Sequence, residues 1–68
     1  MDRRAQILEA ASRLLLQHGP GHVTVADIAR DAGVGVGSVY LEYRSKDEIL
    51  IALSSRRYEQ VLSAMRRA

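Results

Sequence analysis

Glycine and proline divide this chain into helical segments of unequal length. Gly19 and Pro20 form the first interruption, and the run Gly33-Val34-Gly35-Val36-Gly37 forms the second. From Ser45 to Arg67 the chain contains neither glycine nor proline. Because proline cannot continue a helix and glycine commonly ends one, these two interruptions separate three helical segments. A helix-start signal at Ser45 divides the last segment into a very short third helix and a longer fourth one.

The apolar residues recur at helical rather than strand spacing. Over about residues 3–17 they form one stripe, made of Ile7, Ala11, Leu14 and Leu15, with Leu8 and Ala10 at its edges. A second helix opens after Thr24, whose hydroxyl can cap it, with Asp27 favourably placed in its first turn. Its apolar face consists of Val25, Ile28, Ala29 and Ala32. The sequence therefore predicts an all-α fold, with a three-helix helix-turn-helix core followed by a longer fourth helix.

The third predicted helix is very short. It begins after Gly35 and runs over about residues 36–42. Gly37 inside it costs about 1 kcal/mol relative to alanine. The helix therefore needs tertiary support, which we expect from packing by Val39 and Tyr40.

The fourth predicted helix has the strongest start signal, because Ser45 and Glu48 have the spacing of a capping box. Its length, to about Arg67, exceeds what the short helices before it could cover. Its second half carries an apolar stripe that requires another partner, namely Tyr58, Val61, Leu62 and Met65. We expect residues 1–53 to form the helix-turn-helix domain, and residues 54–68 to be the C-terminal half of helix four, which connects to an absent effector-binding domain.

Length and composition exclude several classes of protein. A chain of 68 residues has room for one small domain, and its lack of cysteine removes disulfides and thiolate metal sites. No apolar run approaches the roughly 18–20 residues that cross a bilayer, and the charged N-terminus lacks a signal-peptide pattern. We therefore expect a soluble, cytoplasmic protein without a membrane partner. The net charge of +2 is compatible with nucleic acid, but also with ordinary solvated surface charge.

Catalytic and ligand-binding chemistry finds little support in these residues. The sequence shows no combination of a nucleophile, a base and an orienting group that would indicate catalysis, so we expect no enzymatic activity. His18 and His22 have the spacing of a metal pair, but Gly19-Pro20-Gly21 separates them and no third ligand is evident. The glycine-rich run 33–37 lacks the preceding strand and the Gly-Lys-Ser/Thr ending of a phosphate-binding loop. The sequence thus predicts neither a metal site nor a cofactor.

The second and third helices together have the helix-turn-helix pattern. Gly33 permits the positive φ that a sharp turn between helices needs, and Val34 can fill the angle between them. Such a pair presents the first residues of its second helix outward, where a major groove about 12 Å wide can accept them. A three-helix core without any DNA role is the alternative, since helix pairs of this kind are common.

An ordered set of motifs extends this pattern over residues 7–50. The set comprises Ile7-Leu8-x-Ala10-Ala11, Gly19, Thr24-Val25-x-x-Ile28-Ala29, Ala32-Gly33-Val34, Tyr40-x-x-Tyr43 and Ser45-Lys46-Asp47-Glu48-x-Leu50. Read together, these motifs resemble the N-terminal domain of TetR-family repressors. The resemblance implies a homodimeric transcription repressor that binds double-stranded DNA at a palindromic operator, and whose C-terminal domain binds a small-molecule inducer. Because 68 residues cannot hold that second domain, we expect the chain to be a fragment.

The resemblance also implies roles for individual residues. It places three residues of the third helix against base edges, namely Val36, Gly37 and Ser38. It places Thr24, Tyr40 and Lys46 on the phosphate backbone. Looser candidates for backbone contact are Arg3, Arg4 and Arg44.

Two residues depart from the usual pattern of the family. Glu42 stands where similar proteins carry His or Tyr to hold a phosphate, and its charge would repel one. It can pair instead with Arg44 or Lys46, or accept a hydrogen bond from a cytosine amino group. Tyr43 replaces the usual Phe, so its hydroxyl requires a partner if the ring fills the core.

Alternatives to these roles stay open at this point. Tyr40 could be purely a core residue, and Lys46 could be a solvated residue at a helix start. For the whole chain, a second hypothesis is a helical protein-interaction module. In that case the apolar stripe of the fourth helix binds a partner helix, and the basic residues are only surface.

Overall fold

The computed structural model describes residues 2–55, and all regular structure in this range is helical. α1 spans Arg3–His18, the short 3-10 helix η1 spans Pro20–His22, α2 spans Val25–Ala32 and α3 spans Val36–Glu42. Residues 46–55 form a further helical segment, called here the 46–55 helix. The predicted all-α fold and the order of its helices are thereby confirmed over these residues. η1 was not predicted.

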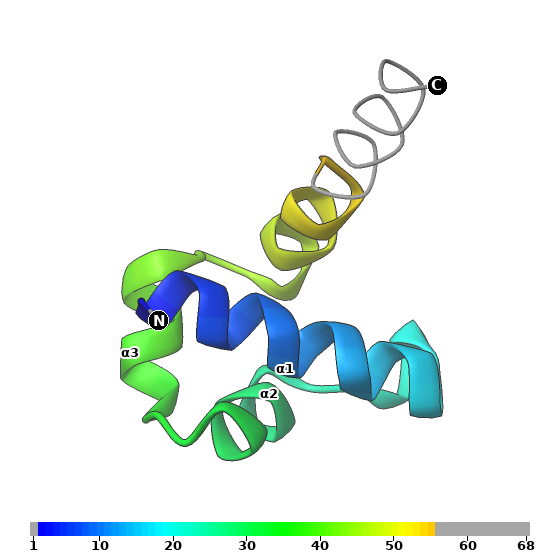
Figure 1. Ribbon diagram of the computed structural model, residues 1–68, viewed down its shortest axis with the longest axis horizontal. Coiled ribbons are helices and arrows are strands. Elements are labelled where there is room, and N and C mark those ends of the chain that lie inside the picture. Colours follow the sequence, from blue (N-terminus) through cyan, green and yellow to red (C-terminus); the bar gives the residue numbers. More distant parts are fainter. Residues whose placement is uncertain (1, 56–68) are drawn as a thin grey trace, which may run out of the picture.

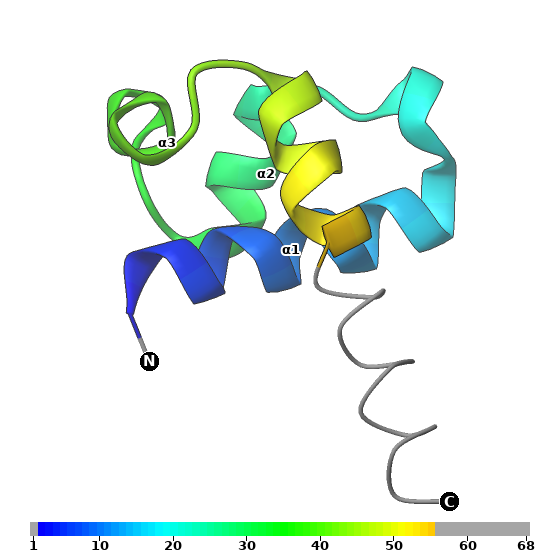
Figure 2. The same ribbon diagram turned by 90° about the horizontal axis from the view of Figure 1, so that it is seen from above.

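α1 is the central element of the fold. In Figure 1, α2 and the 46–55 helix lie on opposite sides of α1, and α3 lies at the end of the molecule where α1 begins. Figure 2 shows α3 nearly end-on while α1 runs across the view, so the two helices cross steeply. No helix in residues 2–55 has both the length and the apolar character needed to span a bilayer.

Local side-chain caps set the starts of α1 and α2. Asp2 accepts a hydrogen bond from the Ala5 N–H at 2.8 Å, which caps α1. At α2, the Thr24 hydroxyl oxygen accepts from the Asp27 N–H at 3.1 Å, and the Asp27 carboxylate accepts from the Thr24 N–H at 3.0 Å. This reciprocal capping box pairs two of the backbone donors at the start of α2. The predicted cap at Thr24 is confirmed.

The turn between α2 and α3 depends on Gly33. Its φ of 75° and ψ of 29° are left-handed, a conformation that costs most other residues about 1–2 kcal/mol. The Val34 N–H donates back to the Ala29 carbonyl at 3.0 Å, which closes the end of α2. The Val34 side chain is half-buried and packs against the core. The predicted roles of Gly33 and Val34 are confirmed.

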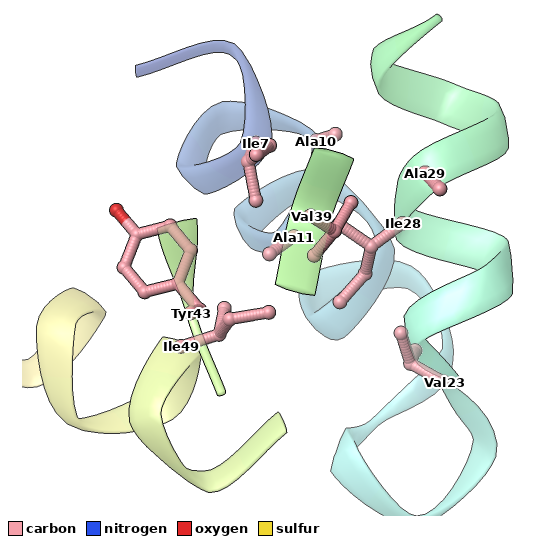
Figure 3. Close-up of a cluster of buried hydrophobic side chains, with 9 residues drawn as sticks. All are labelled: Ile7, Ala10, Ala11, Val23, Ile28, Ala29, Val39, Tyr43 and Ile49. Atoms are coloured by element: carbon pink, nitrogen blue, oxygen red, sulfur yellow. The ribbon is translucent and has the colours of Figure 1, made fainter. Parts of the chain in front are cut away.

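The core draws side chains from every helix described apart from η1 (Figure 3). Its buried members are Ile7, Ala10, Ala11, Val23, Ile28, Ala29, Val39, Tyr43 and Ile49. Alanines contributed by α1 and α2 allow these two helices to approach closely. The apolar stripes predicted for α1 and α2 both face this core, and Ala10, predicted at the edge of its stripe, is fully buried.

The 46–55 helix begins with only half of the predicted capping box. The Glu48 N–H donates to the Ser45 hydroxyl at 3.4 Å, a long hydrogen bond. The Glu48 carboxylate accepts from the Arg44 N–H at 2.8 Å, one residue further back than a capping box requires. The stripe Tyr58, Val61, Leu62 and Met65 lies outside the described residues, and the division at residues 53 and 54 stays a prediction.

Candidate nucleic-acid interface

α3 is buried along one side and exposed along the other. Val39 is fully buried, whereas Val36 is 42%, Tyr40 49% and Leu41 79% exposed, and Gly37 is also exposed. Since 3.6 residues complete a helical turn, Val36, Tyr40, Gly37 and Leu41 follow one another around a single side of α3. We call this side the outer face of α3. The first turn of the helix therefore faces solvent, as reading of a DNA groove requires.

The prediction that Tyr40 packs to hold α3 in place is wrong. Tyr40 lies on the outer face, whereas Val39 and Tyr43 supply the tertiary support. The Tyr43 N–H also donates to the Val39 carbonyl at 2.8 Å, which ends α3. The alternative that Tyr40 is purely a core residue is therefore also wrong, and the side chain of Tyr40 is accessible to a partner.

Arg4, Glu42 and Tyr43 form a cluster where α1 begins and α3 ends. The Arg4 guanidinium carbon lies 5.4 Å from the centroid of the Tyr43 ring, within cation–π range. The Tyr43 hydroxyl points away from the other labelled core side chains (Figure 3). This hydroxyl and, to a lesser extent, the Glu42 carboxylate raise the pKa of Arg4, so the guanidinium stays charged.

The partner of Glu42 differs from the predicted ones. Its Oε2 lies 3.7 Å from the Arg4 Nε rather than beside Arg44 or Lys46, the two protein partners that the sequence suggested. A contact with a cytosine amino group stays a prediction. The reason is tertiary, because the start of α1 packs beside the end of α3. The Arg4 charge offsets that of Glu42, which lowers the repulsion that a nearby phosphate would meet.

Lys46 is held by the chain rather than left in solvent. Its Nζ donates to the Pro20 carbonyl at 2.8 Å and to the Val23 carbonyl at 3.0 Å. It thereby ties the start of the 46–55 helix to the connection between α1 and α2. The alternative of a solvated helix-start residue is wrong. An ammonium group has three donors, so one is left for a phosphate.

Thr24 lies exposed at the N-terminus of α2. Its hydroxyl oxygen accepts from the Asp27 N–H, and the hydroxyl proton can turn to the Asp27 carboxylate or to a phosphate. The Asp27 carboxylate lies beside it, and the Thr24 backbone N–H and hydroxyl lower the pKa of Asp27. The carboxylate therefore stays ionised, and a phosphate at this helix end meets a negative charge as well as the hydroxyl.

The remaining predicted residues surround α3. Ser38 is half-buried on the side of the helix beyond Leu41, and Arg44 is exposed just after α3. Arg3 is exposed at the start of α1, which lies at the same end of the molecule as α3 (Figure 1). The fold thus brings basic side chains from two separate parts of the sequence, the start of α1 and the residue after the α3 C-cap, to the end of the molecule where α3 lies.

Two structural contacts were missed in the sequence. The Arg13 guanidinium donates twice to Asp31 Oδ2, at 2.8 and 3.2 Å, and joins α1 to α2. No local pattern signals this pair. Val23 is buried, and here a signal existed: Val23 precedes the cap and Ile28 is the fourth residue of α2, the spacing of a hydrophobic staple.

An open groove of about 500 Å³ lies between the end of α1 and α2. It is lined by Leu14, His18, His22, Val23, Asp27, Arg30 and Asp31. Within residues 2–55, no three His, Cys, Asp or Glu side chains are grouped so that they could hold a metal ion. The paired histidines therefore line a polar groove and form no metal-ligand set with the acidic residues near them.

The family model for bacterial regulatory proteins of the tetR family matches residues 7–53. The chain belongs to the TetR family. Residues 7–53 therefore carry the helix-turn-helix domain of this family, and the hypothesis of a protein-interaction module is not favoured. The match begins at the first buried residue of α1, Ile7, and continues through the outer face of α3 into the 46–55 helix.

Individual transcriptional regulators resemble the chain over most of its length. It is 41% identical over 58 residues to the HTH-type transcriptional regulator TtgR of Pseudomonas putida, a match covering 85% of the chain and 28% of TtgR. It is 40% identical over 48 residues to the HTH-type transcriptional repressor KstR2 of Mycobacterium tuberculosis, covering 71% of the chain and 24% of KstR2. The crystal structure of a TetR-family transcriptional regulator from Haemophilus influenzae superimposes with a TM-score of 0.84 at 29% identity, over 91% of the chain and 34% of that protein. The chain thus spans about a third or less of the length of these relatives.

Proposed function

We propose that this TetR-family domain inserts α3 into the major groove of double-stranded DNA and reads a specific operator there. The observation that carries the proposal is the outer face of α3. Val36 and Gly37, in the first turn, are exposed while Val39 anchors the opposite side in the core. A helix held in this way can enter a groove without disturbing the packing that supports it.

Within this proposal, individual residues have the roles that the resemblance to the family implies. Residues of the first turn of α3 face base edges, namely Val36, Gly37 and Ser38. Tyr40, which is 49% exposed, places its hydroxyl on the phosphate backbone, as do the Thr24 hydroxyl and the third donor of Lys46. Further backbone contacts come from Arg44 and Arg3, and from Arg4 when it leaves Glu42.

The longer protein to which such a domain belongs acts, in this proposal, as a cytoplasmic homodimeric repressor. Two recognition helices about 34–36 Å apart then meet successive major grooves of a palindromic operator. A region beyond this chain binds the small-molecule inducer. One similar protein is named as a repressor, and the others as regulators, which supports this role and argues against an enzyme.

Fluorescence anisotropy with labelled duplexes tests the proposal. A duplex selected from a random pool should bind at least about tenfold more tightly than a scrambled one, since a single wrong base pair typically costs about 1–3 kcal/mol. The affinity should fall steeply with salt. Tyr40→Phe, which removes only an exposed hydroxyl, should weaken both duplexes alike, whereas Leu16→Ala on α1 serves as the matched control. Equal affinity for selected and scrambled duplexes, or binding that does not depend on salt, would overturn the proposal.

A further inference from the structure

The outer face of α3 carries no charge. It consists of two aliphatic side chains, an aromatic ring and a glycine, namely Val36, Leu41, Tyr40 and Gly37. Between Gly35 and Tyr43 the chain contains no Arg, Lys, Asn or Gln. Glu42 is the one charged residue in α3, and it is half-buried beside Arg4.

α2 does not supply what α3 lacks. Ala26 is exposed in its first turn and offers only a methyl group. Asp27 is engaged in the capping box with Thr24. Arg30 lines the groove between α1 and α2, together with Asp31. α3 therefore contributes no Arg, Lys, Asn or Gln side chain to a DNA groove, and Arg30, the one such residue of α2, lines the groove between α1 and α2.

The absence of Arg, Lys, Asn and Gln from α3 limits which bases this helix can recognise in the major groove. Guanine is recognised mainly by Arg or Lys, and adenine by Asn or Gln, each through paired hydrogen bonds to the base edge. Thymine differs from the other bases because its major-groove edge also carries an apolar group, the C5-methyl. An apolar helix face is complementary to that methyl and to no other group on the major-groove edges.

We infer that this domain reads its operator through thymine C5-methyl groups packed against Val36. The inference rests on the proposed DNA binding and deepens it. Tyr40, one turn along, extends the apolar surface. Gly37 adds no side chain and has nothing within 4 Å of where a Cβ would stand, so the α3 backbone can approach a base edge closely at this point. Guanine pairing contributes little to recognition by α3.

Replacement of thymine by deoxyuridine tests the inference directly, because it removes only the methyl group and leaves every hydrogen-bonding group of the base. In a duplex selected from a random pool with the 68-residue chain at low salt, each thymine is replaced in turn. Replacement of a thymine in contact with Val36 should weaken binding about fourfold, the value of one buried methyl(ene) group of about 0.8 kcal/mol. Thymines outside the site of α3 should tolerate the change.

A protein variant assigns the effect to Val36. Val36→Ala should lower the affinity for the thymine duplex by a similar factor and should bind the thymine and deoxyuridine duplexes equally. Leu16→Ala, which removes an equally apolar side chain that is 77% exposed on α1, should retain the full sensitivity to the methyl group. Circular dichroism of each variant should show the helical spectrum of the parent chain.

The possible results separate this inference from the proposed function. Selective binding of an enriched duplex that is indifferent to every deoxyuridine replacement would overturn methyl reading and leave DNA binding intact. Sensitivity that persists unchanged in Val36→Ala would overturn the role of Val36. Failure to enrich any duplex would overturn the proposed function, and the inference with it.

Discussion

Gly37 should be the position where stability and DNA binding oppose each other. It lies within α3, away from the left-handed region, with open space where a Cβ would stand. Glycine inside a helix is less favourable than alanine by about 1 kcal/mol. Gly37→Ala should therefore raise the free energy of unfolding by up to about 1 kcal/mol, which corresponds to a Tm about 4–8 °C higher for a domain of this size.

The same substitution should weaken DNA binding. In the free protein the added methyl meets nothing, but in the complex it lies where the base edges approach the α3 backbone. We expect a loss of about tenfold in affinity for a selected duplex, comparable to one mismatched base pair of about 1–3 kcal/mol. Thermal unfolding followed by circular dichroism and anisotropy titration of the same sample measure both effects.

Gly21→Ala provides the matched control. Gly21 lies in η1, also without positive φ and without neighbours near a Cβ, but in no α-helix. It reports the effect of alanine on the unfolded chain, about 0.4–1 kcal/mol, and should leave DNA affinity unchanged. A Gly37→Ala variant that is less stable than the parent would refute the packing described for α3. One with unchanged DNA affinity would refute the position of Gly37 in the interface.

Three further perturbations test contacts around the site. Lys46→Met leaves the carbonyls of Pro20 and Val23 without this donor, so it should lower the free energy of unfolding in urea by about 1 kcal/mol. It should also reduce the salt slope of DNA binding by about one. An unchanged midpoint of urea unfolding would contradict the stabilising role of these two hydrogen bonds. Because its partners lower the pKa of Asp27, the stability that this carboxylate contributes is present above the ordinary value of 3.8 and is lost as the pH falls through the lower folded value. Asp27→Asn should reduce the loss of stability that the parent chain shows at acidic pH. An equal loss in both proteins would show that the Asp27 carboxylate is not its source. Arg13 and its partner on α2, Asp31, are largely exposed, so a double-mutant cycle should give a coupling energy of about 0.2–1 kcal/mol. A coupling energy above about 2 kcal/mol would contradict the expectation that solvent weakens this ion pair.

The helix boundaries could be predicted because their signals are local. A cap such as Thr24 acts on backbone groups within three residues, and a glycine such as Gly33 acts through its own φ. The exposed first turn of α3 followed from the same signals, since the turn and the length of the helix fix which residues come first. Local chemistry was sufficient for these features.

The environment of the charged side chains could not be predicted, because it depends on how the helices pack. Arg4 meets Glu42 only because the start of α1 lies beside the end of α3, and Lys46 reaches back 23 residues to Val23. Which of the two tyrosines packs in the core, Tyr40 or Tyr43, could have been predicted from the sequence. Tyr43 is four residues from Val39 and shares its side of the helix, whereas Tyr40 is not at that spacing.

Backbone NMR of the labelled chain titrated with a selected half-site duplex tests the central claim most directly. If the outer face of α3 enters the major groove, the amide signals of Val36, Gly37, Ser38 and Tyr40 should shift most. Those of the α1 end near Leu16 should stay in place. The largest shifts at the end of α1 or along the 46–55 helix, with α3 unaffected, would contradict the account.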